Sequence, residues 1–376
     1  MKQIVLLNDS LIGGGAEKIT LTLAKGFQKR GFNVHIILIK NIIDYDIEND
    51  INIHTLSENG IIFKNKFLNK IALAKRLKEK VKEIEKNGKI EMFISNAEDM
   101  DLLSKKINLN NCFIRYRNSM YQYYLKKYSN KKGLKKFYHK LKHYYKFKSV
   151  YNNRDIITVA KALEDDIINK MKIKPKTIAT IYNPFDFEYI RTKANEYKPF
   201  LNKPYIIYVA KFENRKNQKL LVKAYKKANI DLPLVLMGKT YTESDKKYFK
   251  ELKQLIKDLN LEDKIVFPGF QKNPYPWIKN AKLLVMSSNS EGLPLVLVES
   301  LILNTPVIST DCPTGPKEVL VGNLQEFLSP VGDEEKLTLN IKKALDNYPK
   351  IDKTILEKFQ IDYSINQYLN LIKKEK

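Results

Sequence analysis

Two glutamates, Glu291 and Glu299, stand eight positions apart around an apolar stretch in the segment SSNSEGLPLVLVES, residues 287–300. Pro294 suits the first turn of a helix, so the pattern predicts that Glu291 lies in a loop and Glu299 inside the helix. If the whole stretch were helical, eight residues would rise roughly 12 Å. Carboxylates that act together in glycosidases lie closer, about 5 to 9.5 Å apart. We therefore predict that the two acids contact different parts of one extended ligand.

The helix start between the two acids is a candidate anion site, because unpaired backbone N–H groups and the helix dipole attract negative charge there. The segment at this position consists of Gly292, Leu293, Pro294 and Leu295. Sugar hydroxyls at Glu291, a diphosphate at the helix start and ribose hydroxyls at Glu299 would together fit a nucleotide sugar. The alternative is a loop acid and a surface helix residue without function, because acids at this spacing are common.

The surrounding elements predict two doubly wound α/β domains, each a parallel sheet covered by helices. Strand-like and helical runs alternate in two series, separated by an irregular segment with two prolines near 196–204. The expected strands are 3–8, 33–39, 91–95, 112–116 and 155–160, then 205–210, 232–238, 263–269, 282–288 and 305–310. The expected parts are a first Rossmann-like domain at 1–195, a second at 203–350, and a helix in 351–376 that packs back on the first domain. Ligands of such folds bind at the carboxyl ends of the strands, which predicts a site in a cleft between the two domains.

The composition limits the class of protein. The chain has 376 residues, two cysteines and a formal net charge of +25. The length suffices for two domain cores, and no apolar run is long enough to span a bilayer. The first residues lack the pattern of a secretory signal, and Cys112 and Cys312 suggest neither a disulfide nor a metal site. These features predict a cytoplasmic protein.

The second half of the chain resembles the signature of retaining glycosyltransferases of the two-Rossmann (GT-B) architecture, in the large family GT4, also called glycosyl transferases group 1. The most specific match is SNSEGLPLVLVESLILNTPVISTD, residues 288–311. Further matches in the expected order are GGGAEK (13–18), IYNPFD (181–186), VAKFENRKNQ (209–218), FPGF (267–270), DCPTGPKEVL (311–320) and FQIDYSINQYLNLI (359–372). The resemblance covers nearly the whole chain and is more specific in the second domain than in the first. It implies that the first domain binds the acceptor and the second binds the donor.

By that resemblance, Glu291 contacts the donor sugar and Glu299 contacts the ribose. Lys211 and Lys216 would neutralise the diphosphate, whose charge grows as the glycosidic bond breaks. The sequence departs from the family at one point, because Ala210-Lys211 stands where the family usually has Gly-Arg. A lysine supplies the charge without the bidentate fork of arginine.

The resemblance also assigns parts of the donor site away from the two glutamates. Phe270 lies in the segment whose backbone holds the base, and Gly14 and Gly15 belong to a glycine loop that lets the backbone approach donor phosphate or acceptor. An ordinary tight turn between strand and helix is the alternative for this loop. A nicotinamide enzyme is disfavoured, because Lys18 occupies the third glycine position of the dinucleotide fingerprint.

Many relatives carry a histidine near the sugar in the first domain. The corresponding stretch here is FIRYRNSM, residues 113–120, in which Arg117 and Asn118 are the candidates to replace it. The four histidines of the chain form no metal-ligand pattern, and we expect neither cofactor nor metal. D-x-D occurs at 44–46 and 99–101, as in metal-dependent transferases of the single-domain type, but outside the context of that fold.

A basic, aromatic stretch lies in the first domain between Tyr121 and Val150, with ten lysines, seven tyrosines, two phenylalanines and no acid. From Leu134 onward, apolar and aromatic residues recur at helical spacing with lysines between them. Such helices lie on anionic membrane surfaces, which would present a lipid-linked acceptor to the enzyme. The alternatives are a packed helix with a solvated lysine face and, less favoured, a nucleic-acid surface. No nucleic-acid module accompanies the stretch.

The sequence therefore predicts a retaining, metal-independent glycosyltransferase that moves a hexose or N-acetylhexosamine from a UDP-sugar to a glycan or lipid-linked acceptor. The product would be a bacterial surface polysaccharide, lipopolysaccharide, lipooligosaccharide or capsule, made at the inner face of the cytoplasmic membrane. No residue presents itself as a covalent nucleophile, which favours front-face displacement. The alternatives are a non-catalytic, membrane-associated sugar-binding or scaffolding protein of the same fold, and a GT-B phosphorylase or nucleotide-sugar epimerase.

Overall fold

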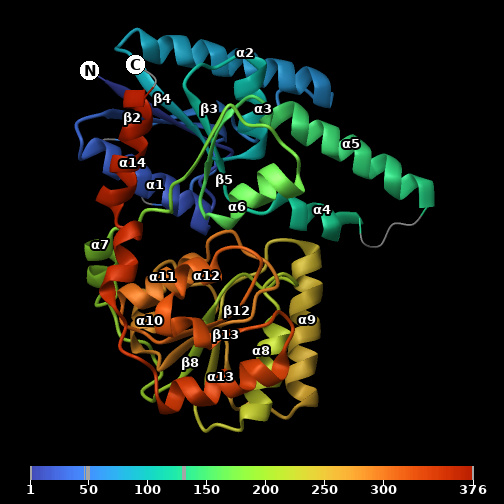
Figure 1. The fold of residues 1–376 in the computed structure, drawn as a ribbon, viewed down its shortest axis with the longest axis vertical. Coiled ribbons are helices and arrows are strands. Elements are labelled where there is room, and N and C mark those ends of the chain that lie inside the picture. Colours follow the sequence, from blue (N-terminus) through green and yellow to red (C-terminus); the bar gives the residue numbers. More distant parts are fainter. Residues whose placement is uncertain (1, 46, 48–50, 129–132, 375–376) are drawn as a thin grey trace. The chain divides into compact units, whose positions relative to one another are not determined.

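The chain forms two compact units in a computed structural model that describes residues 2–45, 47, 51–128 and 133–374. The first unit comprises residues 1–184 and 359–376, and the second comprises residues 185–358 (Figure 1). The division falls earlier than the sequence indicated, because helix α7 (Phe187–Lys193) packs on α10 (Tyr275–Asn280) and α11 (Leu295–Ile302) of the second unit.

The first unit is built on a parallel sheet of seven strands within the described residues, in the order β3-β2-β1-β4-β5-β6-β7. Its strands are β1 (Gln3–Asn8), β2 (Asn33–Lys40), β3 (Asn52–Ser57), β4 (Ile90–Ser95), β5 (Cys112–Tyr116), β6 (Asp155–Thr158) and β7 (Thr177–Thr180). The strand order reverses between β1 and β4. The loops that follow these two strands therefore diverge and leave room for a ligand at the carboxyl edge of the sheet.

Helices cover both faces of this sheet. They are α1 (Gly15–Gln28), α2 (Lys66–Glu85), α3 (Glu98–Lys106), α4 (Met120–Tyr128), α5 (Gly133–Tyr151), α6 (Ala162–Asp165), the π-helix η1 (Asp166–Lys170) and α14 (Ile361–Lys374). Apolar residues of α2 and α3 form one buried cluster with β1, β2 and β4, whereas α1 packs on β1, β2 and α14. The amphipathic patterns of α1 and α2 follow from this one-sided burial.

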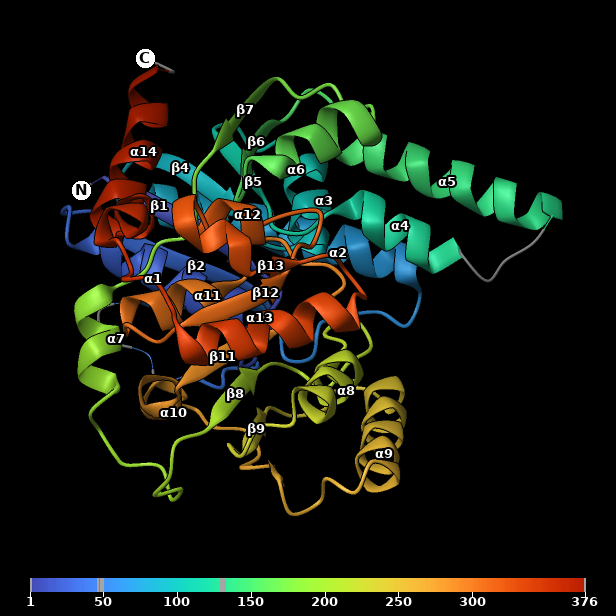
Figure 2. The ribbon, with the colours of Figure 1, turned by 60° about the horizontal axis from the view of Figure 1, so that its bottom comes forward.

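Helices α4 and α5 form a hairpin whose tip, residues 129–132, lies outside the described residues. Helix α5 extends beyond the sheet in both views (Figures 1 and 2). Buried carboxylates hold the base of the hairpin. Asp166 accepts hydrogen bonds from the Ser119 hydroxyl at 2.5 Å and the Tyr116 hydroxyl at 2.7 Å, and Asp101 accepts one from the Tyr151 hydroxyl at 3.0 Å. None of the helices in the described part of the chain is long and apolar enough to span a bilayer.

The second unit holds a parallel sheet of six strands among its described residues, in the order β10-β9-β8-β11-β12-β13. The strands are β8 (Ile206–Val209), β9 (Leu234–Met237), β10 (Ile265–Val266), β11 (Leu283–Met286), β12 (Val307–Thr310) and β13 (Leu328–Ser329). Its remaining helices are α8 (Gln218–Ala228), α9 (Glu243–Asp258), α12 (Pro316–Val319), η2 (Gly322–Phe327), α13 (Glu334–Asp346) and η3 (Lys353–Phe359), which ends at the first residue of the returning segment. The two sheets confirm the predicted architecture of two doubly wound α/β domains.

The C-terminal helix α14 belongs to the first unit and packs closely on α1. The rings of Phe27 and Tyr368 meet edge to face with centroids 5.8 Å apart. Gly26 permits the close approach, because a Cβ atom at this position would lie 2.6 Å from Cγ1 of Ile365. Glycine is otherwise unfavourable in a helix interior, so its presence here follows from the contact.

We predict that Gly26→Ala lowers the thermal stability of the protein. Alanine normally stabilises a helix by about 1 kcal/mol relative to glycine, but the added methyl group overpacks the contact with Ile365 at a cost of about 1–3 kcal/mol. In an Ile365→Ala background the two nearest clashes are gone and a contact of 3.0 Å with Cγ1 of Ile361 remains, so the same change should be less destabilising. Thermal unfolding of the four proteins measures this difference, and a stabilising Gly26→Ala in the wild-type background would contradict the packing.

Candidate active site

The candidate site of the second unit lies where its strand order reverses, between β8 and β11. The loop after β8 (residues 210–217) and the loop after β11 (residues 287–294) meet at this point, as expected for a ligand site in a doubly wound sheet. The Asn289 N–H donates to the carbonyl of Arg215 at 2.8 Å, and the Ser287 hydroxyl donates to the carbonyl of Asn217 at 2.9 Å. These bonds fix the two loops against each other.

Glu291 joins the two loops through its side chain. The Lys216 ammonium donates to Oε1 of Glu291 at 2.5 Å, and the Arg215 guanidinium lies 3.3 Å from Oε2. Arg215 also donates to the carbonyl of Ser290 at 3.0 Å. The side chain of Glu291 is only 7% exposed and that of Lys216 is 17% exposed, so water screens this ion pair little. The site therefore holds a carboxylate between two cations.

The ionisation of Glu291 reflects a competition between burial and its neighbours. Burial acts to raise the pKa of the carboxyl, because the charged form loses its hydration. The charges of Lys216 and then Arg215, together with the hydrogen bond from Lys216, outweigh burial and lower the pKa below its ordinary value. Glu291 is therefore an anion at neutral pH, ready to accept hydrogen bonds from hydroxyl groups.

The loop after β12 holds the predicted Gly292 to Leu295 segment in place. The Thr314 hydroxyl donates to the carbonyl of Glu291, and Gly315 adopts a φ of +94° against Gly292. A Cβ atom at Gly315 would lie 2.3 Å from the carbonyl oxygen of Gly292, so no other residue fits here. Gly292, Leu293 and Pro294 are buried, and Leu295 is half-buried at the first position of α11.

Glu299 lies in a separate environment, within α11 rather than in the loop. It is 6% exposed, and its Oε1 accepts a hydrogen bond from the Tyr275 hydroxyl of α10 at 3.3 Å. The two glutamates thus belong to different sets of contacts. Their contact with different parts of one ligand stays a prediction.

Cations and aromatic rings form a second group at the same edge of the sheet. The Lys211 ammonium lies 4.2 Å from the ring centre of Tyr241, and the Lys239 ammonium lies 4.1 Å from that of Phe270 and 4.9 Å from that of Tyr241. Phe270 is 45% exposed, and Lys211 is also exposed. The structure therefore places Lys211 and Phe270 together, with Lys239 and Tyr241, apart from the ion pairs of Glu291.

In the first unit, the predicted Gly14 and Gly15 lie at the start of α1, after β1. Gly14 is extended, and Gly15 is the first helical residue. The Gly13 N–H donates to Asp44 at 2.9 Å, and the Gly14 N–H donates to the Tyr45 hydroxyl at 2.9 Å. A phosphate or acceptor hydroxyl that used these N–H groups would have to replace the two side chains. Asp44 accepts a hydrogen bond from the glycine loop, so it is not a free carboxylate of the D-x-D segment at 44–46. Asp46 lies outside the described residues.

Arg117 and Asn118 follow β5 at the same edge of the first sheet. Arg117 is half-buried and Asn118 is exposed, and Asp166 anchors their loop through Tyr116 and Ser119. Asp9, a residue not singled out from the sequence, lies after β1. Its pKa is raised to about 6, mainly by burial and then by Asp99, against opposing charges that include Arg117. A carboxyl that titrates near neutral pH is suited to exchange protons with a hydroxyl group.

The second D-x-D segment does not present a pair of free carboxylates. Asp101 is buried and accepts hydrogen bonds from the hydroxyls of Ser95 at 2.5 Å and Tyr151 at 3.0 Å, whereas Asp99 is exposed. Burial raises the pKa of Asp101 to about 7. Its contacts assign it to the base of the α4–α5 hairpin.

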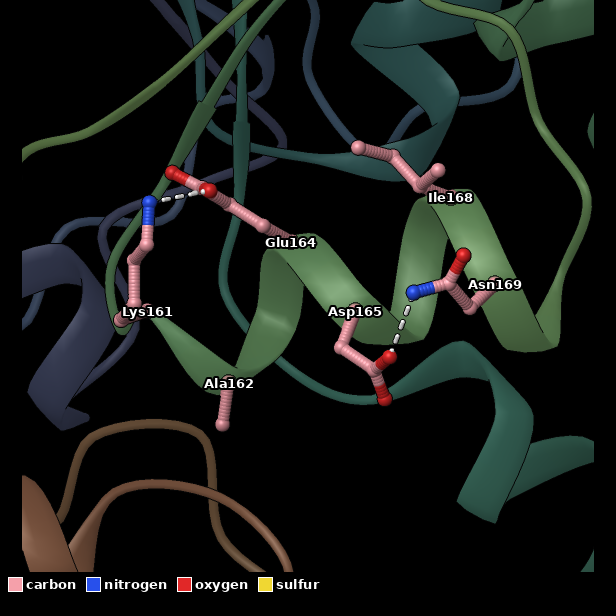
Figure 3. Close-up of a pocket in the computed structure, with 6 residues that line it drawn as sticks. All are labelled: Lys161, Ala162, Glu164, Asp165, Ile168 and Asn169. Atoms are coloured by element: carbon pink, nitrogen blue, oxygen red, sulfur yellow. Dashed lines mark hydrogen bonds and ion pairs between the residues drawn. The ribbon is translucent and has the colours of Figure 1, made fainter.

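An open hollow of about 400 Å³ lies along α6 and η1 in the first unit (Figure 3). Its lining residues are Lys161, Ala162, Glu164, Asp165, Ile168 and Asn169. Lys161 pairs with Glu164 at 2.6 Å, and Asp165 accepts a hydrogen bond from Asn169 at 2.7 Å. Asp165 also pairs with Lys170 at 3.0 Å. Each charged group of the hollow thus has an ion-pair partner, and none of the residues predicted from the sequence lines it.

Two protein-family models match consecutive parts of the chain. The model described as Glycosyltransferase Family 4 matches residues 13–189. The model described as Glycosyl transferases group 1 matches residues 190–358. The chain belongs to the family 4 glycosyltransferases. Its resemblance to this family, noted from the motifs, is thereby confirmed, and the protein is a transferase enzyme.

Relatives of this glycosyltransferase span nearly its whole length. An N-acetylgalactosamine-N,N'-diacetylbacillosaminyl-diphospho-undecaprenol 4-alpha-N-acetylgalactosaminyltransferase of Campylobacter jejuni is 28% identical over 92% of this chain and 91% of its own. A GalNAc-alpha-(1->4)-GalNAc-alpha-(1->3)-diNAcBac-PP-undecaprenol alpha-1,4-N-acetyl-D-galactosaminyltransferase of the same organism is 25% identical over 100% and 99%. The crystal structure of Anabaena HepE in complex with UDP and glucose covers 99% of both chains with a TM-score of 0.77 at 16% identity. The structural likeness confirms the GT-B fold.

Sequence reasoning missed two cations of this glycosyltransferase. Arg215 lies next to Lys216 in the predicted phosphate loop, where one basic residue in a lysine-rich chain gives no signal of its own. Lys239 follows Gly238 directly after β9. Its position after a buried strand could have marked it, since ligand-binding side chains of such sheets follow the strands.

We predict that Lys216→Met lowers the free energy of unfolding by up to about 3 kcal/mol, because it leaves the buried Glu291 carboxylate with Arg215 alone. The double variant Lys216→Met/Glu291→Gln removes the uncompensated charge and should recover most of that loss. Urea unfolding of both variants and of Glu291→Gln completes the cycle. If the loss of stability in the double variant equals the sum of the losses in the two single variants, the pair is not coupled.

Proposed function

We propose that this glycosyltransferase moves a hexose or N-acetylhexosamine from a UDP-sugar to a glycan or lipid-linked acceptor, with retention of the anomeric configuration. The observation that carries the proposal is the buried Glu291 carboxylate held between Lys216 and Arg215. An ionised carboxylate accepts hydrogen bonds from sugar hydroxyls, and adjacent cations neutralise a leaving diphosphate. The two roles occur side by side at the point where the strand order reverses.

The nucleotide would occupy the edge of the second sheet that carries Phe270, Tyr241 and Glu299. Exposed aromatic rings with cations beside them suit a nucleobase, and a buried carboxylate on α11 suits ribose hydroxyls. The neighbouring structure of Anabaena HepE is described as a complex with UDP and glucose. This description supports a uridine nucleotide as donor.

The contacts of Glu291 support retention by front-face displacement. Both its carboxylate oxygens contact cations, which weakens the carboxylate as a nucleophile toward the anomeric carbon. In the proposed step the bond from the anomeric carbon to the phosphate oxygen breaks, and a bond to the acceptor oxygen forms on the same face. The acceptor proton passes to the leaving phosphate. Lys216, Arg215, Lys211 and Lys239 supply positive charge at this edge, so we expect the reaction to proceed without a metal ion.

A lipid-linked acceptor is supported by the names of the two Campylobacter relatives, both of which refer to undecaprenol-linked diphospho-sugars. Helix α5 adds a basic, aromatic surface, with Phe137 65% and Tyr138 and Tyr145 each 60% exposed. Such a surface suits an anionic membrane, and the enzyme would then act at the inner face of the cytoplasmic membrane in surface polysaccharide, lipopolysaccharide or capsule synthesis. A non-catalytic sugar-binding role is disfavoured, because Glu291, Glu299 and Lys216 are all present.

The donor assignment predicts UDP release from a single class of donor. The purified protein is incubated with a panel of UDP-hexoses and UDP-N-acetylhexosamines, with and without an undecaprenol-diphosphate-linked saccharide, and products are identified by mass spectrometry and NMR. We expect acceptor-dependent release of UDP and a product with the donor's anomeric configuration. Glu299→Gln should weaken UDP binding about 5- to 150-fold, the effect of losing a charged hydrogen bond of about 1–3 kcal/mol.

Glu262→Gln, an exposed acid in the same unit, serves as the control and should bind UDP as the wild type does. Wild-type calorimetric affinity of Glu299→Gln for UDP would remove the ribose role. Release of another nucleotide, or no transfer from any UDP-sugar, would refute the donor assignment.

The membrane assignment predicts that neutralising α5 weakens binding to anionic vesicles. Lys140, Lys142, Lys146 and Lys148 are changed together to glutamine, and co-sedimentation with phosphatidylglycerol-containing vesicles is measured. Each basic residue near an anionic surface contributes about 1 kcal/mol, so the partition coefficient should fall by two orders of magnitude or more. The matched control changes Lys247, Lys250, Lys253 and Lys257 of α9 in the second unit. Equal losses in both variants would indicate a nonspecific charge effect.

A further inference from the structure

A second exposed apolar surface lies in the first unit, away from the α4–α5 hairpin, where β3 leads into α2. We call it the β3–α2 patch. Its apolar members are Ile61 (60% exposed), Phe63 (50%), Phe67 (67%), Leu68 (48%) and Ile71 (45%), and its basic members are Lys64, Lys66 and Lys70. Five large apolar side chains within eleven consecutive positions form a concentration of exposed apolar surface that solvent alone does not explain.

Specific hydrogen bonds hold the patch in this conformation. The Asn69 side chain accepts from the N–H groups of Ile62 at 2.6 Å and Phe63 at 3.1 Å, and it donates to the carbonyl of Gly60 at 3.0 Å. Asn65 caps α2 by accepting from the N–H groups of its first turn. The backbone is therefore ordered, and the exposed side chains of Ile61 and Phe63 are presented by a built turn.

The first turns of α2 continue the helix's apolar side beyond the protein core. Phe67 and Ile71 occupy the same i, i+4, i+7 series as Ala74, which is buried with Leu77 and Val81 against the sheet. The only ring contact of a cation with the patch among the described residues is that of Lys106, 5.8 Å from the Phe67 ring centre. The helix thus carries apolar surface where the unit has no core to cover it.

The charge of the patch indicates which kind of partner it can bind. No Asp or Glu occurs from Asn59 to Lys78, a stretch that contains six basic residues. A surface of this kind is complementary to a partner that is both negatively charged and able to accept apolar side chains. An anionic lipid bilayer has both properties, with phosphate head groups above an apolar interior.

We propose that the β3–α2 patch is a second membrane-contact surface, which inserts Phe63, Phe67 and Leu68 into an anionic bilayer while Lys64, Lys66 and Lys70 bind lipid phosphates. This inference rests on the proposed membrane-bound acceptor and adds a contact that is independent of α5. In the parallel sheet, the β3–α2 connection and the start of α4 both lie at the carboxyl edge. Two contacts on one unit bind more tightly than either alone, because the second forms at a high effective concentration.

Tryptophan fluorescence tests the insertion directly. The chain has one tryptophan, Trp277, which is 2% exposed in the second unit. Phe67→Trp adds a reporter to the patch, and Leu339→Trp adds one at a residue of α13 that is 60% exposed. With phosphatidylglycerol vesicles that contain brominated acyl chains, the Phe67→Trp emission should shift to the blue and be quenched, and that of Leu339→Trp should remain unchanged. Absence of quenching at position 67, while the protein sediments with the vesicles, would overturn the proposal.

Co-sedimentation measures how much the patch contributes. Phe63→Ser/Phe67→Ser should lower the partition coefficient at least about tenfold, since insertion of each phenylalanine side chain removes a large apolar surface from water. Lys64→Gln/Lys66→Gln/Lys70→Gln should lower it about fivefold per lysine on anionic vesicles and leave it unchanged on phosphatidylcholine vesicles. Leu339→Ser and Lys247→Gln/Lys250→Gln/Lys257→Gln are the matched controls. Patch variants that bind like the wild type would refute the proposal.

Self-association of the chain and loss of the nucleotide site are each distinguished from membrane contact by one further measurement. Sedimentation velocity reports whether the protein self-associates, and a dimer that Phe63→Ser/Phe67→Ser abolishes would overturn the membrane assignment in favour of a second copy of the chain. UDP affinity by calorimetry should be unchanged in all patch variants, because the proposed nucleotide contacts lie in the second unit. Patch variants that lose vesicle binding but keep UDP binding therefore support membrane contact by the patch. Failure of the wild type to bind UDP would refute the proposed function without affecting the result for the patch.

Discussion

The contact of Glu291 with Lys216 and Arg215 is the interaction on which the second unit's site depends. A buried carboxylate is costly unless cations and hydrogen bonds compensate it, and here they come from a loop about 75 residues earlier in the chain. The pair can form only if both loops leave the sheet at neighbouring strands. The three side chains can therefore meet only because β8 lies beside β11 in the sheet. The hydrogen bonds between the two loops hold them in this position.

In both units the loops at the carboxyl edge of the sheet diverge where the strand order reverses, but the side chains on these loops differ. In the first, the loops after β1 and β4 diverge and bring together the glycine loop, Asp9 and the acids at the start of α3. In the second, the divergent loops bring together one acid and two cations. The first unit thus presents carboxyl groups beside a glycine loop, and the second presents a mostly cationic edge with exposed aromatic rings. This difference fits the division between acceptor and donor that the family resemblance implies.

The interior strands of both sheets could be predicted from the sequence, because strands buried on both faces read as continuous apolar runs. The strands that the sequence did not reveal, β3, β7 and β13, all lie at the edges of their sheets. Their residues are largely half-exposed and their sequences, such as TIAT, lack an apolar run. The start of α11 was predicted from Pro294, which lies directly before the first helical residue, Leu295.

The sequence motifs singled out the candidate site residues but not the contacts between them. Glu291, Glu299 and Lys216 stand out by spacing and motif, but no pattern in the sequence pairs Lys216 with Glu291 or separates Lys211 from them. Lys211 was expected beside Lys216, yet its side chain lies over Tyr241 while Arg215 approaches Glu291. Side-chain direction after a strand depends on the turn that follows, and the left-handed conformation of Asn217, with φ of +47°, is not specified by composition.

The attachment of the α4–α5 hairpin has a structural consequence. Asp166 accepts hydrogen bonds from Ser119 and Tyr116 before α4, and Asp101 accepts one from Tyr151 at the end of α5. The turn that carries Arg117 and Asn118 lies between Tyr116 and Ser119. The same buried carboxylate therefore sets the position of this turn and the direction in which α4 leaves the sheet.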